Sequence, residues 1–141
     1  MAKTKKPPLP LEKTIKDQIL AYLIANQFLA WIQNQGMMIT EHKGKERAVR
    51  FSTMPGISDL QAIRNGRIVF IEVKRSAKEE LRSDQEVFLG AVNRYGGIGF
   101  AAWSIEMVYE TLSRFFPMIP PELYYNLVAQ KAIFASVAIE S

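Results

Sequence analysis

The chain has 141 residues, of which 48% are apolar and 23% charged, and this suits one globular domain with a single core. Eighteen basic residues against 14 acidic ones give a net charge of +4, which is compatible with a polyanionic partner without establishing one. The absence of cysteine excludes disulfides and thiolate metal sites and fits a reducing, intracellular setting. No apolar run approaches the roughly 18 residues that span a bilayer, so no membrane partner is expected.

The N-terminal third predicts a flexible arm, a helix and a short strand. Residues 1–10 are basic and proline-rich, and we expect either a solvated leader or an arm that lies along phosphates. Residues 11–27 are predicted as a helix, because apolar residues recur there at helical spacing. Residues 28–33 are predicted as a strand. Residues 35–51 contain two glycines and many charges, and they predict a loop or an irregular hairpin.

A tight β-hairpin is the clearest local prediction. Asn65-Gly66 is the strongest short-range hairpin signal, because both turn residues must adopt a positive φ. The arms cover residues 58–64 and 67–74 and are apolar on both faces, which predicts a hairpin sandwiched between other layers. A two-residue turn also fixes the register, so the partner of each residue follows from its distance to the turn.

Three polar side chains converge at the open end of this hairpin. The register places Asp59 opposite Glu72, with their Cβ atoms about 4.5–5.5 Å apart. Lys74, two residues further on, projects from the same face. Two opposed carboxylates repel each other without a cation. A site for a divalent ion is therefore a better interpretation of these residues than an ordinary cross-strand charge pair. An ion such as Mg²⁺ takes oxygen ligands, polarises a phosphate and lowers the pKa of a bound water, while Lys74 can position that water or offset negative charge.

Helices and strands alternate in the rest of the prediction. Ser83-Asp84-Gln85-Glu86 matches a capping box with Ser83 as N-cap, and it predicts a helix to about Tyr95. Gly96-Gly97 ends this helix. A strand at 98–103, a helix from Ser104 to about Phe116 and a last helix at 122–134 complete an α/β chain.

Four short motifs follow one another along the chain. They are Pro55-Gly56-Ile57-Ser58-Asp59-Leu60, then Gly66-Arg67-Ile68-Val69-Phe70-Ile71-Glu72-Val73-Lys74, then Ser83-Asp84-Gln85 at a helix start, then Tyr95-Gly96-Gly97 before a strand. In this combination the sequence resembles the VRR-NUC domain of the PD-(D/E)xK nuclease superfamily, over roughly Glu12 to Leu112. One departure is Ser58, because the family often has proline directly before the aspartate.

The resemblance implies a restriction-endonuclease-like αβββαβ core with a mixed central sheet flanked by helices, over residues 11–116. Residues 117–141 are then a C-terminal helical extension, packed on the core or at a dimer interface. Family members of this compact size look like phage or bacterial enzymes that act on branched DNA such as Holliday junctions. The implied protein is a cytoplasmic, Mg²⁺-dependent endodeoxyribonuclease, with Mn²⁺ as the alternative ion. A homodimer would suit a two-fold symmetric junction.

The resemblance also assigns roles to individual residues. The implied metal ligands are Asp59, Glu72, Glu12 and the backbone carbonyl of Val73, and the implied catalytic residues are Asp59, Glu72, Lys74 and Gln85. One ion or two, about 3.5–4 Å apart, would suit three carboxylates. Plainer interpretations remain for two positions: Glu12 near a helix start gains from the macrodipole, and Gln85 in a first helical turn needs no special role.

Two groups of basic residues flank the proposed site. The first comprises Lys43, Lys45, Arg47 and Arg50, and the second comprises Arg75, Lys78 and Arg82. We expect contacts to DNA phosphates, which position a substrate without reading its sequence, although charged runs are usually solvated faces. Three alternative functions stay open: a nucleic-acid-binding module of nuclease ancestry that does not cut, a flap or replication-repair nuclease, and a structural protein whose hairpin charges are incidental.

Overall fold

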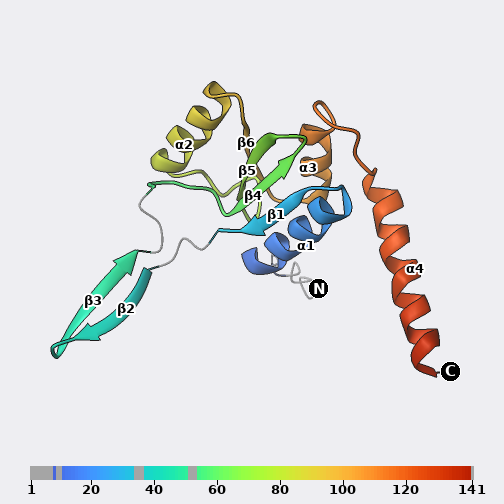
Figure 1. Ribbon diagram of the computed structural model, residues 1–141, viewed down its shortest axis with the longest axis horizontal. Helices are drawn as coiled ribbons and strands as arrows, with labels where there is room; N and C mark the ends of the chain where they lie inside the picture. The colour runs from blue at the N-terminus through green and yellow to red at the C-terminus, as the bar shows by residue number, and fades with distance from the viewer. Residues whose placement is uncertain (1–7, 9–10, 34–36, 51–53, 141) are drawn as a thin grey trace, which may run out of the picture. The chain divides into compact units, whose positions relative to one another are not determined.

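The computed structural model describes residues 8, 11–33, 37–50 and 54–140, so the predicted arm at 1–10 lies almost entirely outside it. The elements, labelled in Figure 1, are α1 (Glu12–Ala25), β1 (Leu29–Ile32), β2 (Met37–His42), β3 (Lys45–Arg50), β4 (Leu60–Arg64), β5 (Arg67–Val73), α2 (Ser83–Arg94), β6 (Ile98–Ala102), α3 (Ile105–Leu112) and α4 (Pro121–Glu140). They fall into two compact units, Met1–Trp103 and Ser104–Ser141.

A four-stranded mixed sheet forms the centre of the first unit. Its strand order is β1-β4-β5-β6, with β1, β4 and β5 antiparallel and β6 parallel to β5. Parallel neighbours need a crossover connection, and α2 supplies it between β5 and β6. Helix α1 contacts β1, β4 and β5, while α2 contacts β5 and β6 (Figure 1). The predicted α/β class with a mixed sheet flanked by helices is therefore confirmed.

The predicted β4–β5 hairpin forms with its expected register. Asn65 has φ 52° and Gly66 has φ 75°, and Arg64 pairs with Arg67 and Leu60 with Ile71. Because the turn occupies only two residues, the register carries unbroken to the open end of the hairpin, where Asp59 and Glu72 lie.

The core of the first unit lies between this hairpin and its flanking helices. On one face of the hairpin the apolar side chains are each at most 1% exposed; these are Leu60, Ala62, Val69, Ile71 and Val73. The buried side chains of α1 are those predicted from helical spacing, namely Ile15, Ile19, Tyr22 and Leu23. On the other face, Phe70 packs edge-to-face against Phe88 of α2 with 5.0 Å between ring centroids. Each fully buried aliphatic side chain contributes about 1.5–3 kcal/mol.

Strands β2 and β3 form a regular two-stranded ribbon, where the sequence predicted a loop or an irregular hairpin. His42 pairs with Lys45 and Met37 with Arg50, with no interruption. Lys43 and Gly44 form the turn, at φ 54° and 73°. A lysine with positive φ is uncommon, so the residue types at this turn carry no clear hairpin signal.

The start of α2 corrects the predicted capping box. The helix begins at Ser83, its N-cap is Arg82, and Gln85 is the N3 residue. The Gln85 side chain accepts a hydrogen bond from the Arg82 backbone N–H at 2.9 Å, so the contact predicted for Glu86 is made one residue earlier. Side-chain hydrogen bonds from Gln85 to the end of β5 fix this choice.

The second unit consists of α3 and α4. Ser104 caps α3 as predicted, accepting a hydrogen bond from the Met107 N–H at 3.2 Å. The helix ends at Leu112, earlier than the predicted Phe116, and α4 continues to Glu140. The Tyr125 hydroxyl donates a 2.7 Å hydrogen bond from α4 to the Glu106 carboxylate of α3. The proposed division at residue 117, and the docking of 117–141 on the core or a second subunit, stay predictions.

Candidate active site

Four polar side chains are buried together at the end of the β4–β5 hairpin. Asp59 directly precedes β4, Glu72 lies near the end of β5, Lys74 directly follows β5, and Gln85 is in the first turn of α2. Their exposed fractions are 7%, 3%, 7% and 4%, respectively. Charged side chains are rarely this buried unless they are paired or hold an ion. The four residues therefore form a buried polar cluster and not a set of solvated surface groups.

Asp59 is held by the backbone of the neighbouring strand. The pairing of β4 with β5 ends at Leu60 and Ile71, and beyond it the Val73 N–H donates to Asp59 Oδ2 at 2.9 Å. The side chain of Asp59 thus replaces a ladder hydrogen bond and is fixed beside Glu72. The role of the Val73 carbonyl as a ligand stays a prediction.

Gln85 connects the lysine to the second carboxylate. Its Oε1 accepts a hydrogen bond from Lys74 Nζ at 3.1 Å, and its Nε2 donates to Glu72 Oε1 at 2.8 Å. Together with the bond from the Arg82 N–H, these contacts fix which way the amide points. The structure therefore places Gln85 in contact with Glu72 and Lys74, and its catalytic role stays a prediction.

Glu72 is the most perturbed group of the site. Burial is the largest cause that raises the pKa of Glu72, and the nearby Asp59 carboxylate raises it further. Lys74 partly opposes the rise, and the pKa of Glu72 is about 8. Its Oε2 atom is fully buried and has no hydrogen-bond partner among the described residues. A cation at this oxygen would relieve both conditions. A pair of carboxylates is also the donor set that Mg²⁺ prefers, so these residues fit a hard divalent ion.

Lys16 of α1 reaches into the same cluster, and the sequence reasoning missed it. Its Nζ lies 3.3 Å from Asp59 Oδ1 and 3.4 Å from Glu12 Oε1. Burial lowers the pKa of Lys16, but Asp59 and Glu12 outweigh this effect and the net shift is upward. The spacing of four residues between Glu12 and Lys16 is the signal that could have found the helical pair.

Glu12, predicted as a third metal ligand, contacts Lys16 and remains apart from the carboxylate pair. Within 11–33, 37–50 and 54–140, no three Asp, Glu or His side chains gather closely enough to hold a metal ion. Glu12 still contributes to the upward pKa shift of Glu72, so it lies within electrostatic reach. The structure brings Asp59 and Glu72 together, and the Lys16 ammonium separates Glu12 from Asp59.

The predicted DNA-contacting residues lie in two segments of the chain. Arg75, Lys78 and Arg82 are exposed on the connector between β5 and α2, directly after the buried cluster in the chain. Arg82 Nε lies 3.2 Å from Asp84 Oδ1, an exposed pair of little energetic weight. The other group is on the β2–β3 ribbon: Lys43 and Lys45 are exposed at its turn, and Arg47 and Arg50 lie in β3. DNA contact stays a prediction for both groups.

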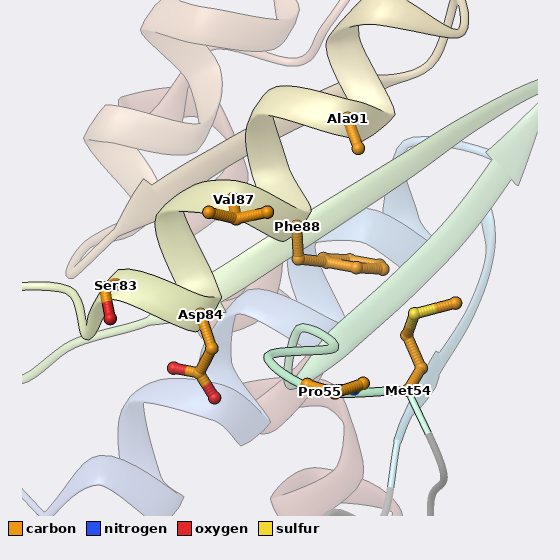
Figure 2. A pocket seen from close by; sticks show the side chains of 7 residues that line it. All are labelled: Met54, Pro55, Ser83, Asp84, Val87, Phe88 and Ala91. Carbon is orange, nitrogen blue, oxygen red and sulfur yellow. The ribbon is translucent and has the colours of Figure 1, made fainter.

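An apolar hollow of about 400 Å³ lies between the turn at Met54 and the first turns of α2. Figure 2 shows its lining, formed by Met54, Pro55, Val87, Phe88 and Ala91, with Ser83 and Asp84 at one end. Apolar side chains therefore line most of this hollow on the side of α2.

The turn before Asp59 is packed tightly against the start of α2. Gly56 has φ +72°, and a Cβ atom there would overlap the Asp84 carbonyl and lie 2.8 Å from the Gln85 nitrogen. Ser58 is fully buried, and its Oγ has no hydrogen-bond partner in the part of the chain that the structure describes. This turn therefore sets the distance between the Asp59 strand and the helix that carries Gln85.

Gly56→Ala is expected to destabilise the protein by about 2–5 kcal/mol, since it combines a left-handed conformation with a clash against backbone. Gly66→Ala is the matched control, because Gly66 has a similar φ of +75° but nothing within 4 Å of the added Cβ. Urea unfolding of both variants measures the difference. Equal losses of stability in the two variants would show that the contact with α2 is not tight.

Neither a family model nor a curated protein matches this sequence. Across the described residues, no helix combines the length and apolar character needed to cross a bilayer.

Proposed function

We propose that this chain is a metal-dependent DNA endonuclease with a PD-(D/E)xK-type site. The observation that carries the proposal is the buried Glu72 carboxylate, which has an unpartnered Oε2 among the described residues and lies beside Asp59. The sheet supports it, because α1, β1, β4, β5, α2 and β6 follow the αβββαβ order that the resemblance implies. The β2–β3 ribbon is then an insertion after the first strand of that core.

Each residue of the cluster has a role in this proposal. Asp59 and Glu72 hold Mg²⁺, with Mn²⁺ as the alternative. The bound ion would polarise the scissile phosphate and lower the pKa of a bound water. Lys74 directs its ammonium toward the reacting groups, where it orients the water or offsets negative charge. Gln85 keeps Lys74 and Glu72 in place through its two side-chain hydrogen bonds, and such supporting contacts are worth 10–100-fold in metal affinity or activity by order of magnitude.

We further propose that the substrate is branched DNA and that the enzyme works as a homodimer. The exposed Arg75, Lys78 and Arg82 supply positive charge beside the site. Exposed apolar side chains on α4 supply surface for a second subunit; they are Leu123, Tyr125, Leu127 and Val128, each 42–50% exposed. A symmetric dimer presents two sites to the two halves of a four-way junction.

Cleavage assays on a labelled four-way junction, a flap and a linear duplex, with Mg²⁺ or with EDTA, test the proposal. Paired symmetric nicks in the junction that require Mg²⁺ are expected. Preferential cutting of the flap would support the replication-repair alternative. Metal-independent binding without cutting of any substrate would overturn the nuclease in favour of a binding module.

A further inference from the structure

The Lys16 ammonium lies between two carboxylates of the cluster. Its Nζ contacts both Glu12 and Asp59, while Asp59 also lies beside Glu72. We propose that Lys16 is a built-in cation that takes the place of a second metal ion, so that each chain binds one divalent ion, between Asp59 and Glu72. This inference rests on the proposed function and adds the number of metal ions to it.

The contacts of Asp59 support this arrangement. In two-metal sites the ions lie about 3.5–4 Å apart and act on the same reacting group. The Lys16 ammonium is already within 3.3 Å of Asp59 Oδ1, and its side chain is only 22% exposed. A metal ion between Glu12 and Asp59 would have to displace this ammonium, which would then be a partly buried charge without either carboxylate.

The charges of the site agree with a single ion. Three carboxylates, from Glu12, Asp59 and Glu72, face two ammonium groups, from Lys16 and Lys74. One divalent ion already leaves the cluster with a positive excess of one. A second divalent ion would add two further positive charges to a partly buried cluster, which is costly because nearby like charges repel strongly away from water.

The ammonium differs from a metal ion in what it can do. It supplies charge and three N–H donors but coordinates no water as a metal ion does, so water would be activated only at the single bound ion. Lys16 is a positioning residue in this scheme: it orients Asp59 and holds Glu12 back from the bound ion.

Counting Mn²⁺ ions by electron paramagnetic resonance tests the inference without measuring activity. The wild-type chain is expected to bind about one Mn²⁺, and Lys16→Ala about two, because the pocket between Glu12 and Asp59 becomes free for an ion. Lys16→Arg restores the cation and should return the count to about one. Lys13→Ala is the matched control, since Lys13 lies on the exposed side of α1, 3.6 Å from Asp17.

Two Mn²⁺ ions in the wild-type chain, or a single ion in a folded Lys16→Ala variant, would overturn the inference and leave the proposed nuclease intact. If the wild-type chain binds no Mn²⁺, or if Asp59→Asn leaves Mn²⁺ binding unchanged, the proposed function fails and this inference fails with it. Circular dichroism checks that the variants fold. If Lys16→Ala does not fold, the counts for the wild type and Lys16→Met decide, because methionine keeps an apolar stem of similar length.

Discussion

Asp59→Asn is expected to reduce Mg²⁺-dependent cleavage about 10³-fold or more while leaving DNA binding in place. Asparagine keeps the shape and an oxygen that can accept the Val73 N–H bond, but it removes the charge that holds the ion. Stabilisation of transition-state charge by a metal ion is worth several kcal/mol, and about 4 kcal/mol corresponds to about 10³-fold in rate. The loss should appear in the rate of the chemical step.

Single-turnover cleavage of the junction measures this rate, and gel-shift titration in Ca²⁺ or EDTA measures binding separately. Asp17→Asn is the matched control, because Asp17 is an exposed carboxylate of the same unit that pairs only weakly with Lys13. A folded Asp59→Asn variant that cleaves within about tenfold of the wild type would contradict a metal-ligand role for Asp59, since ligand loss should cost far more.

The part of the site formed by the β4–β5 hairpin follows from the sequence. Asn65-Gly66 determines a local conformation with positive φ at both residues, and the two-residue turn then fixes the whole register. For this reason the residue order alone is enough to place Asp59 beside Glu72. The fully buried face on the other side of the hairpin was also predictable, because apolar residues alternate along both arms.

The contacts between distant elements could not be predicted in this way. Lys16 and Asp59 meet because α1 packs against β1 and β4, and no local rule sets the rotation of a helix over a sheet. The start of α2 was misplaced for a related reason. Ser83 and Glu86 satisfy a capping pattern in sequence, but Gln85 makes the corresponding contact because it is also bound to Lys74 and Glu72.

The β2–β3 ribbon illustrates a different limit. Its turn uses Lys43 and Gly44, and only the glycine favours positive φ. The ladder from Met37 to Arg50 supports the turn through its backbone pairing, so the unfavourable lysine conformation is offset by interactions that residue preferences do not reveal. The fold class was accessible from the sequence, whereas the regularity of this segment was not.

The affinity for a divalent ion is expected to rise about tenfold per pH unit between about pH 6 and pH 8, and to level off above that, because binding must displace one proton from Glu72. Burial first, and Asp59 second, raise the pKa of Glu72 to about 8 from an ordinary 4.5. Below pH 8 the folded, metal-free protein therefore holds a proton that Mn²⁺ or Mg²⁺ has to release. The total change over these two pH units is about 100-fold.

The same shift predicts how stability depends on pH in EDTA. Because the pKa of Glu72 is higher in the folded chain than in the unfolded chain, the native state binds more protons between about pH 4.5 and pH 8. The contribution of Glu72 to stability is thus present at low pH and is lost as the pH rises through about 8. Added Mn²⁺ should restore stability most strongly at pH 8, where the ion meets an ionised carboxylate.

Titration calorimetry with Mn²⁺ at three pH values and thermal unfolding in EDTA measure the two effects. Glu72→Gln should remove the pH dependence of unfolding due to this group and also abolish tight Mn²⁺ binding. Glu86→Gln, an exposed carboxylate in the same helix turn as Gln85, is the control and should change neither. A Mn²⁺ affinity that is the same at pH 6 and pH 8 would mean that Glu72 is already ionised at pH 6. The ammonium groups of Lys16 and Lys74 would then stabilise the ionised carboxylate more than burial destabilises it.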